Sequence, residues 1–202
     1  MYPIPENQAA METLIRAVMT QEGLTFILAT YKVVDELSAR ANEQLETPLA
    51  CGKGCSFCCR QLVTCTGIEW EAIMGWQRAR GLFESLSAYF RKWCKQWRNY
   101  LRNHEHEIAE SCYKPLEDWH GKPCVFLDAR GECMVYPARP IDCRTMTSTV
   151  RCAQWTKQAG VKRFRHPWEL WANNLIVEEA ARREGQAQTT PLIHWLAVET
   201  GK

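Results

Sequence analysis

Apolar positions recur at intervals of three and four residues along most of the chain, which is the pattern of amphipathic helices. The first such stretch covers residues 7–46, where Gly23 falls between two apolar stripes and predicts a break between two helices. The next covers residues 66–80 and begins with a capping box formed by Thr66 and Glu69. This part of the chain therefore predicts three helices.

The same periodicity continues in the second half of the chain. It predicts a long helix over about residues 82–113, closed by Pro115, and another over residues 167–185, whose first residue is a proline suited to a first turn. A last short helix covers residues 191–199, and residues 121–152 carry the turn signals and prolines of a loop. We therefore expect a mainly α fold, with two irregular cysteine-rich metal-binding loop regions.

The pattern also organises the chain into segments. Its 202 residues suit a single domain with a sizeable core. Within residues 1–202 we expect an N-terminal helical segment over 1–48, a cysteine-cluster core over 51–152 and C-terminal helices over 161–202.

Composition and charge narrow the class of protein. The hydrophobic content of 46% and the charged content of 24% are ordinary for a soluble globular protein. The net charge of +2 gives no broad basic field, so nucleic acid is not implied. No apolar run approaches the ~18 residues that span a membrane, and the first residues lack the basic and apolar regions of a secretory signal. We expect a cytoplasmic protein without a membrane partner, and its protein or small-molecule partner stays open.

Eleven cysteines are the feature that departs from an ordinary composition. In a reducing cytoplasm, closely spaced cysteines more often bind metal or do redox chemistry than form disulfides. Gly52 and Gly54, between the first cysteines, let the backbone turn tightly around a bound ion. Two blocks outside the amphipathic helices supply eight candidate metal ligands: Cys51, Cys55, Cys58, Cys59, Cys124, Cys133, Cys143 and Cys152.

The number of thiols limits the kinds of metal centre. One zinc ion needs four ligands in a tetrahedron, and the adjacent Cys58 and Cys59 cannot easily both reach one ion without strain. Eight thiolates therefore suggest either two four-cysteine sites or one polynuclear centre with spare ligands. A proline near a ligand cysteine, as Pro140 is near Cys143, is familiar from ferredoxins and favours an iron–sulfur cluster. Thiolates also bind zinc well, so zinc or iron ions stay open.

The two blocks in this order resemble the YkgJ-type cysteine-cluster family, which is described as a zinc- or iron-chelating domain. The family's first block ends in two adjacent cysteines, as "CGKGCSFCCR" does, and its second block is similar to "CVFLDARGECMVYPARPIDCR". The resemblance implies that the first seven cysteines of the two blocks are ligands, and Cys152 is assigned as the eighth by its position. Arg60, Arg139 and Arg144 also stand on family motif positions, where N–H···S bonds would compensate a thiolate-rich centre.

Three functions are compatible with such a centre. The first is a metal-binding protein whose role is open. The second is an enzyme with an open iron that binds a substrate or S-adenosylmethionine, because some relatives, including a domain of flagellin lysine methylases, carry an iron–sulfur cluster. The spacing of Cys51, Cys55 and Cys58 also matches radical S-adenosylmethionine enzymes, but the helices predicted over residues 66–113 leave no place for their barrel. No nucleophile elbow, phosphate loop or paired-carboxylate motif is visible, so an enzyme stays uncertain. The third is a metal-delivery or partner-binding module.

The remaining cysteines and two histidines fall outside the pattern. Cys94 shares a helical face with aromatic residues, which predicts a core position. Cys65 is close enough to the first block to be a spare ligand, and Cys112 lies at the end of a predicted helix. His104 and His106 are two residues apart on a helix and so face different directions, with His104 on the apolar face.

Overall fold

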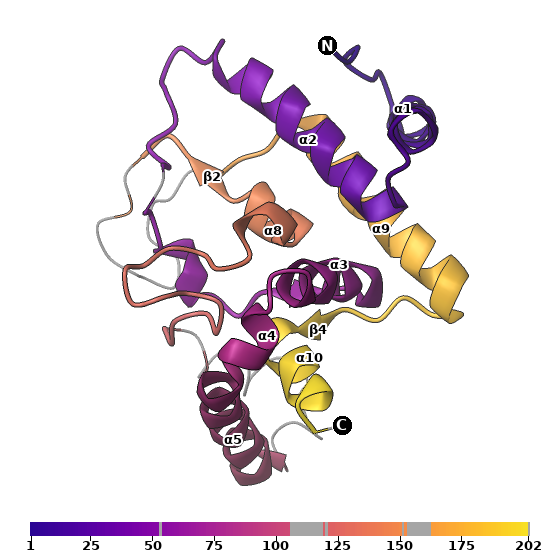
Figure 1. Cartoon of the computed structure of the whole chain (residues 1–202). Coiled ribbons are helices and arrows are strands. Elements are labelled where there is room, and N and C mark those ends of the chain that lie inside the picture. The colour runs from indigo at the N-terminus through magenta and orange to yellow at the C-terminus, as the bar shows by residue number, and fades with distance from the viewer. Residues whose placement is uncertain (53, 106–118, 120, 151, 153–162, 202) are drawn as a thin grey trace.

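A computed structural model describes residues 1–52, 54–105, 119, 121–150, 152 and 163–201 (Figure 1). These residues form eight α-helices and a few very short strands, which confirms the predicted mainly α fold. The helices are α1 (Gln8–Glu22), α2 (Phe26–Asn42), α3 (Gly67–Arg78), α4 (Leu82–Ser85), α5 (Ser87–Asn103), α8 (Ile141–Arg144), α9 (Pro167–Glu184) and α10 (Leu192–Glu199).

The ends of the long helices lie at the predicted local signals. Gly23 follows α1 in the left-handed conformation, with φ of 64°, and separates it from α2. Thr66 and Glu69 form the predicted capping box at the start of α3. Pro167 occupies the first turn of α9, and Gly185 ends that helix with φ of 78°. These boundaries are set by backbone chemistry that a few neighbouring residues determine, so the sequence predicted them well.

The prediction of one continuous helix over residues 82–113 is wrong in the length of that helix. Leu86, with φ of −97° and ψ of 10°, separates the short α4 from α5. The hydroxyl of Ser85 donates to the Leu82 carbonyl oxygen at 3.1 Å, a local side-chain bond that competes with continued helix. Helix α5 then ends at Asn103, and residues 106–118 lie outside the described part of the chain.

The buried apolar side chains form two clusters. The first apolar cluster consists of the buried side chains of α1, α2 and α9 together with Ile68 and Ile141. The second apolar cluster consists of those of α5, α10 and residues 119–138, together with Cys65 and the α3 residues Trp70, Ile73 and Met74. Because one face of α3, with Ile68 and Ala72, contacts the first cluster and another face contacts the second, α3 lies between the two, as Figure 1 shows.

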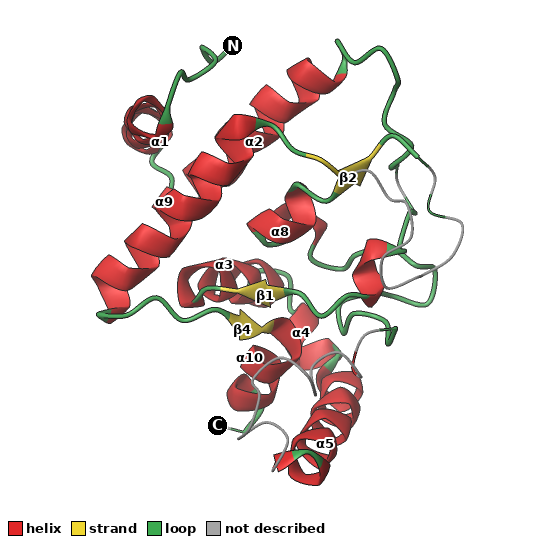
Figure 2. Cartoon of the chain, turned by 180° about the vertical axis from the view of Figure 1, so that it is seen from behind, coloured by secondary structure: helices red, strands yellow, loops and turns green. Residues whose placement is uncertain are grey.

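Two small antiparallel sheets connect distant parts of the chain. Their strands are β1 (Thr64–Cys65), β2 (Thr147–Ser148), β3 (Arg163–Phe164) and β4 (Thr190–Pro191). β1 pairs with β4, which puts Cys65 opposite Thr190 (Figure 2). β2 pairs with β3, which puts Ser148 opposite Arg163.

The C-terminal helices, expected as one segment over residues 161–202, divide between the two clusters. α9 packs with α1 and α2, whereas α10 packs with α5. Both figures show α9 and α10 on different sides of α3. Among the helices of the described residues, none has the length and apolar character needed to cross a membrane.

Candidate metal centre

The two cysteine blocks are far apart in sequence but contact each other. The N–H of Cys124 donates to the carbonyl oxygen of Cys59 at 2.7 Å, and the N–H of Gly121 donates to that of Arg60 at 2.8 Å. The guanidinium of Arg60 returns a hydrogen bond to the Gly121 carbonyl oxygen at 3.1 Å. Figures 1 and 2 both show these segments on the side of the molecule opposite α1.

The first block is a tight turn followed by one turn of 3-10 helix, η1 (Cys58–Arg60). The N–H of Cys55 donates to the Gly52 carbonyl oxygen at 3.0 Å. Gly54 has φ of 84°, which favours glycine, so the predicted tight turn is confirmed at this position, while the bound ion stays a prediction. Cys55 is exposed, and the other three cysteines of the block are half-buried.

The second block begins with a hairpin-like loop. Leu127 and Cys133 form an isolated antiparallel bridge across it. At its tip, Oδ1 of Asp128 accepts hydrogen bonds from the N–H groups of Arg130, at 2.9 Å, and Glu132, at 2.8 Å. The loop therefore brings the first two cysteines of the second block back toward each other, and both pack against the second apolar cluster.

The third cysteine of the second block lies on the short helix α8. The carbonyl oxygen of Pro140 accepts the N–H groups of Cys143 and Arg144, both at 3.0 Å, so this proline begins the turn that carries the thiol. Oε1 of Glu69 accepts the N–H of Ile141 at 2.8 Å. Glu69 is 2% exposed and belongs to α3, so a buried carboxylate attaches α8 to the middle of the fold.

Arg144 attaches the same turn to α2. Its guanidinium forms an ion pair with Asp35 at 2.5 Å and lies 3.9 Å from the ring centre of Tyr31. It also donates to the carbonyl oxygen of Arg139 at 2.9 Å and to that of Pro137. The Arg144 side chain is only 2% exposed. In the described residues its hydrogen bonds go to oxygen, so it positions the turn of Cys143 from the side of α2.

Arg139 and Arg60 differ in how they face the thiols. The positive charge of Arg139 acts on the thiols of Cys58, Cys133 and Cys143. Arg60 is exposed, and its guanidinium bonds the loop that precedes the second block. Charge compensation of a thiolate centre is therefore supported most directly for Arg139.

One group of thiols gathers where the first block meets the end of the second. Electrostatic interactions join Cys51 to Cys55, Cys58 and Cys152. Cys152 interacts in turn with Cys55 and Cys58. We refer to Cys51, Cys55 and Cys152 as the outer thiols.

The other group gathers around the start of the second block. Cys143 interacts with Cys124 and Cys133, and Cys124 with Cys133. We refer to these three as the inner thiols. Cys59 interacts with Cys124 and Cys143, whereas its neighbour Cys58 interacts with members of both groups. Cys58 is therefore the thiol that adjoins both groups.

Burial and close contact shift the acidity of these thiols. Burial raises the pKa of Cys124 to about 12 and raises the pKa values of Cys133 and Cys143 above the usual range. The Cys59 thiol donates to the Cys58 sulfur, which lowers the pKa of Cys58 and raises the pKa of Cys59. Most of these groups are thus neutral at pH 7, and a bound cation would supply the charge that stabilises their thiolates.

The donor atoms suit a thiolate-bound metal in type. Thiolate is the ligand of structural zinc and of iron–sulfur clusters. Within the described ranges, however, no three Cys, His, Asp or Glu side chains stand at the spacing of ligands to one ion. Coordination would require the sulfur atoms to converge, which is usual where metal binding is coupled to folding.

The residues set aside in the sequence take mainly core positions. Cys94 is fully buried in the second apolar cluster, which confirms its predicted role. Cys65 is 1% exposed in the same cluster and interacts electrostatically with Cys143. His104 is half-buried, and its Nδ1 lies 2.8 Å from the carbonyl oxygen of Tyr100. The expectations for Cys112 and His106 fall outside the described residues.

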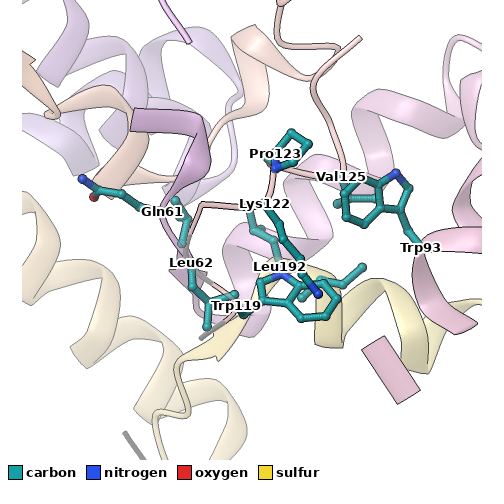
Figure 3. A pocket seen from close by; sticks show the side chains of 11 residues that line it. Gln61, Leu62, Trp93, Trp119, Lys122, Pro123, Val125 and Leu192 are labelled. Carbon is teal, nitrogen blue, oxygen red and sulfur yellow. The ribbon is translucent and has the colours of Figure 1, made fainter. Parts of the chain in front are cut away.

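A depression beside the start of the second block is lined in part by Cys124 (Figure 3). Trp93, Trp119, Lys122 and Cys124 line it, and the Lys122 ammonium lies 3.8 Å from the centre of the Trp119 ring. The backbone of Cys124 thus lies between this depression and the first block.

Sequence reasoning missed three polar side chains that position the blocks. The capping box identified Glu69 as a helix start, but gave no sign that its other oxygen holds Ile141. The turn signal "DARGE" located the hairpin of Asp128 without showing its capping bonds. Asp35 occupies an exposed position of α2 that carries no local signal of its pairing with Arg144.

Models of protein families, curated proteins and solved structures give no match to this chain. The family resemblance therefore stays a prediction that depends on the two cysteine blocks.

Proposed function

We propose that the protein binds metal through its eight cysteines, as an iron–sulfur cluster or as zinc or iron ions. The observation that carries the proposal is the 2.7 Å hydrogen bond from the Cys124 N–H to the Cys59 carbonyl oxygen. It joins two thiol-rich loops that are separated by 64 intervening residues in the sequence. The proposal agrees with the YkgJ-type resemblance of the same two blocks.

Backbone N–H groups aimed at sulfur support this function. The N–H of Phe126 donates to Sγ of Cys124 at 3.5 Å, and the backbone of Val135 donates to the Cys133 thiol. Such bonds stabilise thiolates and adjust the potential of iron–sulfur centres. In the proposed site these N–H groups would orient the sulfur atoms. The metal would supply the positive charge that stabilises the buried thiolates.

The test is the metal content of protein purified without oxygen. Iron, acid-labile sulfide and absorbance near ~400 nm would identify an iron–sulfur cluster, and a colourless zinc protein would identify zinc. Cys124→Ser should lower the metal content, whereas Cys94→Ala, at a buried position of α5 outside both cysteine blocks, should not. Reduced protein that holds neither iron nor zinc, and takes up neither when they are added, would contradict the proposal.

A second function, delivery of metal to a partner, is favoured by the exposure of Cys55. An exposed ligand can be reached by an incoming thiolate before the other ligands are released. We expect such a protein to lose part of its metal quickly to a competing chelator. Full retention of metal against excess chelator would exclude delivery while leaving metal binding intact.

A further inference from the structure

We propose that the exposed face of α5 is an interaction surface for the phosphate backbone of a nucleic-acid duplex. This helix contains no acidic residue and five cationic ones, which are Arg91, Lys92, Lys95, Arg98 and Arg102. The net charge of +2 is a sum over the whole chain and conceals this local excess, which is why composition alone does not imply nucleic acid. Such a surface does not depend on the proposed metal-binding function.

Four of these cations lie in one row along the helix. Arg91, Lys95, Arg98 and Arg102 follow one another at intervals of four, three and four residues, which places them on one side of α5. All four are exposed. At a rise of about 1.5 Å per residue, the row is about 16 Å long, with a cation every ~4.5–6 Å. We refer to these four residues as the basic stripe. Figure 1 shows α5 at the edge of the molecule.

The charge of the basic stripe is not neutralised within the described ranges. Among those residues, no ion pair joins the stripe to an acidic side chain. The guanidinium of Arg98 donates to the carbonyl oxygen of Ala197 at 3.3 Å, and that of Arg102 donates to Oδ1 of Asn99 at 2.7 Å. Both acceptors are neutral, so these bonds orient the side chains without cancelling their charge.

The surroundings of the stripe favour a partner that is bound through charge alone. Trp97 is buried in the second apolar cluster, and Trp93 and Tyr100 pack against that cluster. Within α5, no large apolar side chain of the described residues is exposed. Basic helices at membranes insert apolar side chains into the lipid, single-stranded nucleic acids stack on aromatic rings, and protein partners use aromatic anchors. The exposed face of α5 offers none of these.

A duplex suits a surface that offers only cations. It carries one phosphate charge per about 1.7 Å of its axis, so it provides many charges along the length of the stripe. Three of the four side chains are arginines, whose planar guanidinium groups match phosphate oxygens in pairs. Contacts to phosphates hold a protein on the backbone without reading the bases. We therefore expect binding that is independent of sequence and steeply dependent on salt.

The experiment measures binding of the reduced full chain to a short, fluorescently labelled DNA duplex of mixed sequence by anisotropy. With four phosphate contacts, the affinity should fall about 100-fold between about 50 and 200 mM salt. Lys95→Gln/Arg102→Gln leaves two contacts, so its affinity should fall only about tenfold over the same range. Arg16→Gln/Arg182→Gln removes the same charge from α1 and α9, and should show the salt dependence of the parent protein.

Three outcomes would overturn the proposal. Equal salt dependence of the two double variants would show that the basic stripe is not the contact surface. Tighter binding at the same salt to vesicles rich in phosphatidylserine, or to a polyglutamate peptide, would identify a membrane surface or an acidic protein as the partner instead. Absence of duplex binding by the parent protein in low salt would exclude the surface, and would leave the proposed metal binding unaffected.

A measurement on the parent protein covers the case in which a variant does not fold. Exposed lysines are acetylated with and without the duplex in low salt, and the modified residues are identified by mass spectrometry. We expect the duplex to protect Lys95, whereas Lys32, an exposed lysine of α2, should be acetylated equally in both samples. Equal acetylation of Lys95 with and without the duplex would refute the assigned surface.

Discussion

Replacement of the buried carboxylate of Glu69 tests how the fold holds the turn of Cys143. Glu69 is 2% exposed. Its Oε1 accepts the N–H of Ile141 at 2.8 Å and the hydroxyl of Tyr31 at 3.2 Å. Its Oε2 accepts the N–H of Thr66 at 2.9 Å and the Thr66 hydroxyl at 3.1 Å. One side chain thus joins α3 to α2 and to α8.

The Glu69→Gln variant keeps the shape of the side chain but replaces one carboxylate oxygen, an acceptor, by an NH₂ group, a hydrogen-bond donor. If the amide oxygen continues to accept from Ile141 and Tyr31, the amide NH₂ faces the Thr66 N–H, which is then left without an acceptor. A buried donor without a partner costs about 1–3 kcal/mol, and the remaining bonds lose any assistance from charge. We therefore expect the free energy of unfolding to fall by about 2–3 kcal/mol.

Glu69 should also make stability depend on pH in a defined direction. Burial raises its pKa above the usual value of 4.5, although its hydrogen bonds oppose this effect. Since the folded protein then binds the proton more tightly than the unfolded chain, the carboxyl contributes stability that is fully present below pH 4.5. That contribution is lost as pH rises through the folded pKa. The Glu69→Gln variant should lack this loss of stability with rising pH.

Urea unfolding, followed by tryptophan fluorescence at several pH values, measures both effects. Glu71→Gln is the matched control, because Glu71 lies on the same helix but is exposed. If Glu69→Gln and Glu71→Gln unfold at the same urea concentration and share one pH profile, the carboxylate does not hold α8 in the way described.

Three further perturbations address the rest of the site. Arg144→Met removes the ion pair with Asp35 and the charge-assisted hydrogen bonds to the carbonyl oxygens of Arg139 and Pro137, so it should lower the free energy of unfolding by about 2–3 kcal/mol in a urea titration; the exposed Arg130→Met should change it little. Gly131→Ala should lower the free energy of unfolding by about 1–2 kcal/mol in the same assay, because φ is 78° at this position. Gly52 has no positive φ and open space around it, so Gly52→Ala should have little effect, and equal effects of the two variants would contradict the assigned backbone strain. Removal of metal with a chelator should lower the melting temperature but keep most of the helical circular dichroism, because the first apolar cluster contains none of the eight cysteines. Complete loss of helix on removal of metal would show that the first apolar cluster does depend on the metal centre.

The elements that sequence predicted best are those that local chemistry determines. The glycine after α1 and the capping box of α3 act within one helical turn, so a reader of the sequence can identify both. The break at Leu86 is different, because the apolar repeat continues across it and only the hydroxyl of Ser85 competes with the helix. The pairing of β1 with β4 joins residues more than a hundred positions apart, and two-residue strands carry no periodicity.

The candidate site likewise combines features that the sequence shows with contacts that only the fold creates. The identity of the cysteines and the turn of Pro140 are visible in the sequence. The contact between Cys59 and Cys124 depends on the packing of the intervening helices, and no spacing rule gives it. The electrostatic partners of Arg144 are equally hidden, because Asp35 looks like any solvent-facing acid on an amphipathic helix.

The two halves of the proposed centre are supported very unequally by the fold. Around Cys143 and Cys133, the buried Glu69 of α3, the ion pair of Arg144 with Asp35 of α2 and the second apolar cluster fix the backbone before any metal is considered. Around Cys55, the chain is held mainly by its own turn and by the contact of Ala50 with β2. Metal bound by the inner thiols would therefore gain from preorganisation, whereas metal bound by the outer thiols would itself have to order its ligands.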